Sequence, residues 1–255
     1  MTQWLDRDGV RIAYDVRPGP ADALPLLLTH GYGSSLAMWA PNLDSLSARR
    51  TVISWDMRGH GESDSPDDPA AYSHALTVED MVAVLDACDA PAAAVGGLSL
   101  GGFMSLDFYR SHADRVRCLL LFDTGPGFKK DESRQGWNDY AMSTAARYDE
   151  RGLDALSTSP EARRGKHNPA GLAHAARGML AQRDAGVISS LPDVGVPTLV
   201  LVGADDKSFL AAADYMSTTI PKAEKVVLAD AGHAANIDQP EAFNDAVNDF
   251  LSRYA

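Results

Sequence analysis

The segment Gly97-Leu98-Ser99-Leu100-Gly101 places a serine between two glycines, after a short apolar run and before a helical pattern. A serine hydroxyl is a weak nucleophile, so it needs a position clear of the backbone where a base can take its proton. A sharp strand-to-helix turn provides that position, and the flanking glycines let the neighbouring backbone approach closely. The spacing predicts that Ser99 is a nucleophile. Taken alone, the pattern also fits a glycine-rich helix start that serves only packing.

A nucleophilic serine needs a base, and the base needs an orienting acid. His233 follows an apolar strand pattern and precedes a helix, which predicts a loop at the carboxyl end of the sheet, where Ser99 is also expected. Three carboxylates qualify as the acid by position. Asp205 and Asp206 follow one predicted strand, and Asp123 follows another. The residues alone leave this choice open.

Acyl transfer also needs two backbone N–H groups aimed at the developing oxyanion. We expect one from Leu100, because the first N–H groups of a helix have no intrahelical acceptor. The segment His30-Gly31-Tyr32-Gly33 follows an early apolar strand and is expected to provide the other through the amide of Tyr32. Gly31 and Gly33 would let this loop turn tightly. For His30, bracing the loop is favoured over a catalytic role.

Strand and helix patterns alternate along the chain, which is typical of a mainly parallel sheet covered by helices. The predicted strands are Val10–Val16, Leu24–Thr29, Thr51–Trp55, Ala92–Leu98, Arg117–Phe122, Thr198–Val202 and Lys225–Leu228. The predicted helices are Leu36–Leu46, Thr77–Cys88, Leu100–His112, Phe209–Thr219 and Glu241–Tyr254. Thr77 is expected to cap its helix, and Pro240 to occupy a first helical turn.

No strand pattern occurs between Asp123 and Pro197, where only helical patterns are found. We predict a core formed by residues 1–123 and 197–255, and a helical lid, residues 124–196, over the carboxyl ends of the strands. A second helical layer without a role in substrate choice is the alternative. Three apolar lid residues are pocket candidates or, equally, parts of the lid's own core: Trp137, Tyr140 and Met142.

Composition limits the classes of partner. The net charge of −12 and the scattered basic residues argue against nucleic acid. The start of the chain lacks a signal-peptide pattern and no stretch is apolar enough to span a membrane, so we expect a soluble, cytoplasmic protein without a membrane partner. No Cys/His cluster has the spacing of metal ligands, and we expect no metal and no cofactor. The sequence does not indicate an oligomeric state.

Five motifs in order resemble those of the α/β-hydrolase superfamily, over almost the whole chain outside the lid. The motifs are His30-Gly31-Tyr32-Gly33, Trp55 to Ser63, Gly97 to Gly102, Gly203-Ala204-Asp205-Asp206 and Ala231-Gly232-His233. The resemblance implies the α/β-hydrolase fold, a mostly parallel central sheet flanked by helices with an inserted helical lid. It also implies that Asp206, the third residue after the strand-end glycine, is the acid, and that Asp205 is a loop carboxylate.

Departures within the superfamily narrow the chemistry. Epoxide hydrolases and haloalkane dehalogenases have Asp at the nucleophile position, so Ser99 argues against both. Ring-cleavage carbon–carbon hydrolases also use Ser and commonly carry a Trp soon after the catalytic His and an Arg in the lid. Here Ala234-Ala235-Asn236-Ile237 follows His233, which weakens that interpretation. The chain is more similar to small, lidded carboxylesterases and enol-lactonases, which implies hydrolysis of an ester, lactone or related acyl bond in a small molecule. A carbon–carbon bond hydrolase, a cofactor-free perhydrolase and a hydrolase-derived small-ligand receptor remain alternatives.

Overall fold

The computed structural model describes residues 2–156, 160, 162 and 165–254. Its centre is one eight-stranded sheet with the strand order β1-β2-β4-β3-β5-β6-β7-β8. The strands are β1 (Gln3–Arg7), β2 (Val10–Arg17), β3 (Leu26–Thr29), β4 (Val52–Trp55), β5 (Ala93–Leu98), β6 (Val116–Phe122), β7 (Thr198–Gly203) and β8 (Ala223–Leu228). Pairing is antiparallel from β1 to β2 and from β2 to β4, and parallel through the rest of the sheet. The predicted α/β architecture is confirmed.

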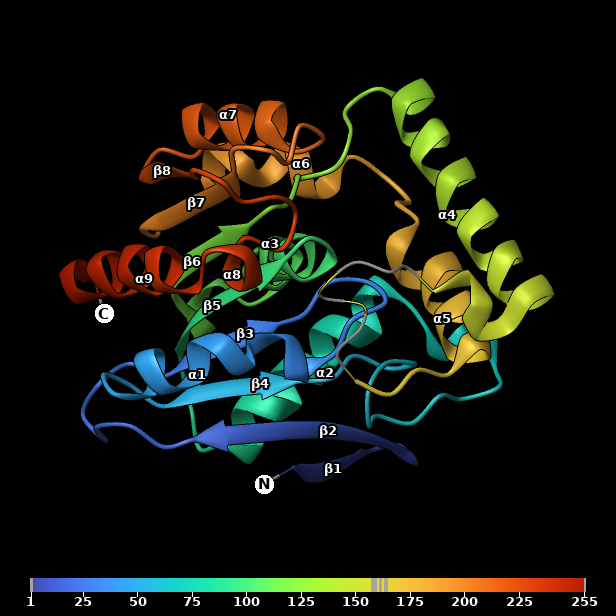
Figure 1. Ribbon diagram of the computed structural model, residues 1–255, viewed down its shortest axis with the longest axis horizontal. Coiled ribbons are helices and arrows are strands. Elements are labelled where there is room, and N and C mark those ends of the chain that lie inside the picture. Colours follow the sequence, from blue (N-terminus) through green and yellow to red (C-terminus); the bar gives the residue numbers. More distant parts are fainter. Residues whose placement is uncertain (1, 157–159, 161, 163–164, 255) are drawn as a thin grey trace.

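Helices follow most strands and cover both faces of the sheet (Figure 1). They are α1 (Ala40–Ser47), α2 (His74–Ala87), α3 (Leu100–Ser111), α4 (Asp131–Arg151), α5 (Pro169–Ala175), α6 (Gly186–Ser190), α7 (Leu210–Thr219), α8 (Ala235–Asp238) and α9 (Pro240–Tyr254). Short turns of 3₁₀-helix precede α1 and α2 and follow α3, α4 and α6, and residues 176–180 form a π-helical turn after α5. No helix within this described part is long and apolar enough to cross a membrane.

Two apolar layers hold the sheet between the helices, because successive side chains of a strand point to opposite faces. On β6, Leu119 and Leu121 belong to the layer that contains residues of α2, α3 and α7, whereas Leu120 and Phe122 belong to the layer that contains residues of α1 and α9. All four are buried. A strand buried on both faces tolerates consecutive apolar residues, as Cys118–Phe122 of β6 show.

The chain between β6 and β7 carries α4, the turns after it, α5 and α6. In Figure 1, α4 and α5 are set off from the sheet and lie beyond the ends of the central strands. These two helices pack against each other, and α6 packs against α3. The segment 124–196 therefore adds a helical unit beside the sheet.

Several element starts differ from the sequence predictions by one to four residues, one strand was not predicted, and one helix has another cap. Residues 3–7 form the edge strand β1, which no apolar pattern indicated, because only one face of an edge strand contacts the protein. Helix α2 begins at His74 instead of Thr77, and Ser73 is its cap, with the Ser73 hydroxyl accepting a hydrogen bond from the Leu76 amide. Pro240 begins α9, as predicted.

Candidate active site

Ser99 occupies the turn between β5 and α3. Its backbone has φ 55° and ψ −117°, a left-handed conformation that an L-residue rarely adopts. Hydrogen bonds hold the strained peptide on both sides: the Ser99 amide donates to the carbonyl of Phe122 at 2.9 Å, and the Thr124 hydroxyl donates to the Ser99 carbonyl at 2.6 Å. Strain of this kind persists only where the surroundings determine it, and it is concentrated at functional sites.

The glycines around Ser99 are required by the space available. A Cβ on Gly101 would lie 2.2 Å from the carbonyl oxygen of Thr29, and a Cβ on Gly97 would lie 2.5 Å from the backbone of Gly101. A Cβ on Gly31, in the loop after β3, would lie 3.4 Å from the Ser99 Cβ. The loop after β3 is therefore in direct contact with the turn that carries Ser99.

His233 is paired with Asp206, as the resemblance implied. The Nδ1 atom of His233 lies 2.7 Å from Oδ2 of Asp206, which is buried, whereas Asp205 is exposed. The Asp205 amide donates to the carbonyl of Ala231 at 2.9 Å, which ties the loop after β7 to the loop that carries His233. The ring of Phe209 stacks on His233 with the centroids 5.0 Å apart.

Phe209 is a site residue that sequence reasoning did not identify. Its amide donates to the carbonyl of Asp206 at 3.0 Å, so a single turn fixes both the carboxylate and the stacking ring. The only sequence signal for this turn is that an aromatic residue, Phe209, follows Asp206 by three positions just before a helix. The hydrogen bond to Asp206 and the stacking on Phe209 together fix the orientation of the His233 imidazole.

Asp123, the third acid candidate, is fully buried beside the same loop. Its Oδ1 accepts a hydrogen bond from the Gly203 amide at 2.8 Å, while its Oδ2 has no partner among the described residues. Burial raises the pKa of Asp123 to about 8; the Gly203 hydrogen bond and the nearby His233 oppose the rise, and the nearby Asp206 adds to it. The carboxyl of Asp123 is therefore mostly protonated at neutral pH.

The two predicted oxyanion donors belong to the two segments that adjoin Ser99, the start of α3 and the loop after β3. Leu100 is the first residue of α3, where helix N–H groups have no intrahelical acceptor, and Tyr32 follows Gly31 in the loop after β3. The Tyr32 hydroxyl donates to the carbonyl of Leu172 in α5 at 2.8 Å. His30 is buried and braces this loop: its Nε2 accepts from the Met57 amide at 3.1 Å, which leaves Nδ1 to donate to the Gly31 carbonyl at 2.7 Å.

Ser99 and His233 line one cavity of about 1010 Å³, together with Tyr32 and Leu100. The predicted pocket residues Trp137 and Tyr140 also line it, and the Trp137 indole donates to the Leu180 carbonyl at 2.8 Å. Met142 is a correction: it does not line the cavity and is 42% exposed. Two residues beyond Tyr140, a helix has turned by about 200°, so Met142 lies on the opposite side of α4.

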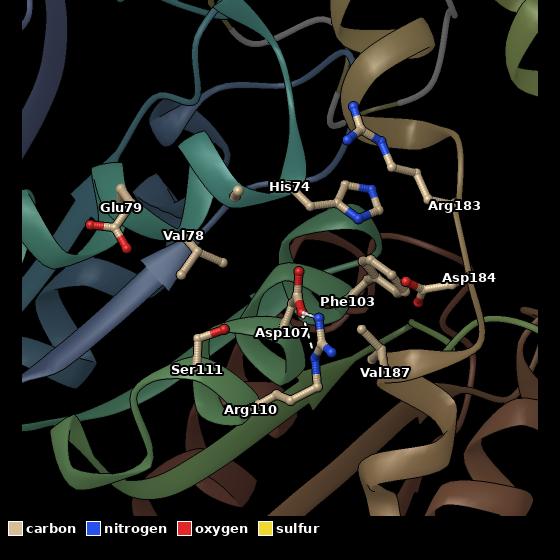
Figure 2. A pocket seen from close by; sticks show the side chains of 11 residues that line it. His74, Val78, Glu79, Phe103, Asp107, Arg110, Ser111, Arg183, Asp184 and Val187 are labelled. Carbon is tan, nitrogen blue, oxygen red and sulfur yellow. Dashed lines mark hydrogen bonds and ion pairs between the residues drawn. The ribbon is translucent and has the colours of Figure 1, made fainter.

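A second, smaller cavity of about 230 Å³, shown in Figure 2, shares Phe103 with the lining of the first. Its walls are polar. His74 Nε2 lies 2.8 Å from the Met179 carbonyl, and the Asp107 carboxylate pairs with Arg110 at 2.8 Å. It contains neither Ser99 nor His233. Within the described residues, no cluster of three or more His, Cys, Asp or Glu side chains could hold a metal ion.

Known proteins resemble this chain over nearly its full length. The model of the Alpha/beta hydrolase family matches residues 26–246. A 3-oxoadipate enol-lactonase of Acinetobacter baylyi is 28% identical, over 92% of this chain and 91% of the relative. A putative 2-succinyl-6-hydroxy-2,4-cyclohexadiene-1-carboxylate synthase of Bacillus subtilis is 26% identical, over 96% of each chain. The structure of a thermophilic esterase from Thermogutta terrifontis superposes with a TM-score of 0.84 at 27% identity, covering 99% of this chain and 98% of the esterase.

Proposed function

Since the chain belongs to the alpha/beta hydrolase family, we propose that it cleaves a carboxylic ester, a lactone or a related acyl bond of a small molecule through Ser99, His233 and Asp206. Membership of the family and its named relatives make the protein an enzyme with hydrolase activity. The assignment of the three residues and of the bond they cleave is our inference.

One observation carries the proposal. A serine held in left-handed backbone geometry lines the same cavity as a histidine whose Nδ1 is bonded to a buried carboxylate. A nucleophile, a base and an acid that orients the base are the parts that acyl transfer requires. The names of the enol-lactonase and the esterase agree with a carbonyl substrate.

The mechanism follows from these positions. Ser99 Oγ attacks the substrate carbonyl while His233 Nε2 accepts the hydroxyl proton, which forms a tetrahedral oxyanion. The amides of Tyr32 and Leu100 donate to that oxyanion. The intermediate then collapses, the bond to the leaving oxygen breaks, and His233 gives the proton to that oxygen, which leaves as an alcohol. Water then attacks the acyl-enzyme with His233 again as base, and the acid product leaves. Asp206 holds the imidazole tautomer and stabilises the imidazolium throughout.

The energetic contributions differ between these groups. Each oxyanion donor is worth about 3 kcal/mol of transition-state stabilisation, and loss of the serine or the histidine costs more. The segment 124–196 is proposed as a lid, because Trp137 and Tyr140 of α4 line the same cavity as Ser99 and His233. Exclusion of water by such a lid strengthens every hydrogen bond inside the site.

Active-site labelling tests the proposal. A fluorophosphonate is expected to add to the wild-type protein with a single mass increment, mapped by peptide mass spectrometry to Ser99. The Ser99→Ala variant is expected to lose both the label and the hydrolysis of short p-nitrophenyl esters. A parallel screen of esters, lactones and thioesters then ranks the acyl bonds.

A second serine of the cavity provides the matched control. Ser208 also lines the cavity but lies in the loop after β7, outside the strained turn. The Ser208→Ala variant is expected to keep the label. A label that persists in Ser99→Ala, or that moves to Ser208 in the wild-type protein, would refute the assignment of Ser99 as the nucleophile.

A further inference from the structure

The described lining of the catalytic cavity contains a single permanently charged side chain, Arg147 of α4, and no Asp or Glu. The chain as a whole has 35 acidic and 23 basic residues, with a net charge of −12. Among the described residues, the cavity wall therefore carries a cation and no carboxylate, whereas the chain as a whole is acidic. Such a wall favours an anionic ligand.

Arg147 faces the cavity because of its position on the helix. Tyr140, Thr144 and Arg147 have the spacing i, i+4 and i+7, which places them on one face of α4, and all three line the cavity. The guanidinium donates to the Thr144 hydroxyl at 3.0 Å. Burial raises the pKa of Tyr32 and of Tyr148, and the nearby charge of Arg147 opposes that rise.

Within the described residues, no carboxylate pairs with the guanidinium of Arg147. Two arginines of this helical unit have acidic partners: Arg134 pairs with Asp131, and Arg177 pairs with Asp149. Arg151 donates only to a backbone carbonyl and does not line the cavity. Arg147 forms no ion pair with any carboxylate of the described residues. A guanidinium presents several N–H donors in a planar fork that matches a carboxylate, so an unpaired one on a cavity wall is suited to that group.

We propose that the acyl substrate carries a carboxylate in addition to its scissile bond, and that Arg147 binds this carboxylate. This inference rests on the proposed function, since it concerns the substrate of the same site. A cavity of about 1010 Å³ has room for a dicarboxylic half-ester or for a lactone with a carboxylate side chain. Arg147 then selects the substrate and orients its carbonyl, without taking part in bond cleavage.

Paired esters test the inference. We compare p-nitrophenyl monoesters of succinate, glutarate and adipate with the p-nitrophenyl esters of butyrate, valerate and hexanoate, which match them in chain length and lack the charge. For at least one chain length, the wild-type enzyme is expected to have the higher kcat/KM for the carboxylate ester. In Arg147→Gln, the ratio of charged to neutral kcat/KM is expected to fall roughly tenfold or more, mostly through KM, as for a lost hydrogen bond to a charged group. Arg147→Lys is expected to keep part of the ratio.

The same helix offers a matched control. Arg151 lies about one turn beyond Arg147, donates to the Asp154 carbonyl at 3.1 Å and does not line the cavity. The Arg151→Gln variant is expected to keep the wild-type ratio. An unchanged ratio in Arg147→Gln, or an equal fall in Arg151→Gln, would overturn the inference.

Failure of the proposed function is distinguishable from failure of this inference. Loss of fluorophosphonate labelling at Ser99 rejects the nucleophile, whereas a labelled enzyme that prefers the neutral esters rejects only the role of Arg147. Calorimetry with monomethyl glutarate on Ser99→Ala protein measures binding without turnover. Binding that Arg147→Gln weakens in this background supports the inference even if no ester is cleaved, and equal binding contradicts it.

Discussion

Replacement of Asp123 by Asn tests whether a protonated carboxyl lies beneath the proposed catalytic acid. Asp123 is fully buried, and its Oδ2 has no partner among the described residues. Burial raises the pKa of this group to about 8 from its ordinary value of 3.8. The folded protein therefore binds a proton more tightly than the unfolded chain over this range of pH.

The sign of the effect follows from proton linkage. Below pH 3.8 Asp123 is neutral in both states and costs nothing. Between that pH and about 8, the unfolded chain releases the proton and the folded protein keeps it, so the free energy of unfolding falls by up to about 1.4 kcal/mol per pH unit. The cost reaches about 4 kcal/mol at pH 7, on an order-of-magnitude basis, and stops growing above the folded pKa.

The Asp123→Asn variant cannot titrate at this position. Its side-chain oxygen can still accept from the Gly203 amide, whereas its new NH₂ group is left without an acceptor, at a cost of roughly 1–3 kcal/mol that does not depend on pH. The difference in unfolding free energy, variant minus wild type, is therefore expected to rise steadily from pH 4 to pH 8 and then to level off. The change of this difference with pH tests the pKa of Asp123. The part that is constant with pH reports only the unpaired NH₂ group.

Urea unfolding at one-unit steps from pH 4 to pH 9 measures this slope. Equal m-values for the two proteins at each pH show that the compared states are the same. Asp205→Asn, at an exposed carboxylate of the neighbouring loop, is the control and is expected to show no such slope. A difference that is flat with pH, or that falls as pH rises, would refute the burial argument for Asp123.

Three further outcomes are expected. Asp206→Asn is expected to lower kcat by about 10³–10⁴-fold, and Asp205→Asn by less than about threefold, in p-nitrophenyl ester assays; the reverse order would reassign the acid. Gly101→Ala is expected to abolish turnover and to destabilise the fold by roughly 1–3 kcal/mol in urea unfolding, because its Cβ would meet the backbone of β3. The control Gly136→Ala, on the exposed side of α4, is expected to be neutral or stabilising. Ser73→Ala is expected to lose about 1 kcal/mol of stability, measured by thermal unfolding, and an unchanged midpoint would contradict its role as the cap of α2.

The placement of Ser99, His233 and the acid candidates at one edge of the sheet could be predicted because each follows a strand, whereas the choice of Asp206 among the acids came from the family resemblance. A buried parallel strand has a clear apolar signature, and the residue after it lies at the carboxyl edge of the sheet whatever the rest of the chain does. Ser73 and the strand β1 could not be placed in this way. The cap depends on which of two nearby hydroxyl residues begins the helix, and β1 is defined by its pairing with β2.

The role of Arg147 could not be predicted from the sequence for a different reason. The sequence of α4 is polar with scattered aromatic residues, so no apolar stripe indicates which side of the helix faces the core. Its orientation is set by packing of Ala141 and Ala145, which are fully buried, and only then do Tyr140 and Arg147 face the cavity. Met142 was misplaced for the same reason. If Arg147 binds the substrate's carboxylate, substrate choice in this enzyme depends on how an inserted helix is seated, whereas the proposed catalytic groups depend on the sheet. Substitutions at Ala141 or Ala145 that rotate α4 are then expected to change the ratio of charged to neutral kcat/KM while fluorophosphonate labelling of Ser99 persists.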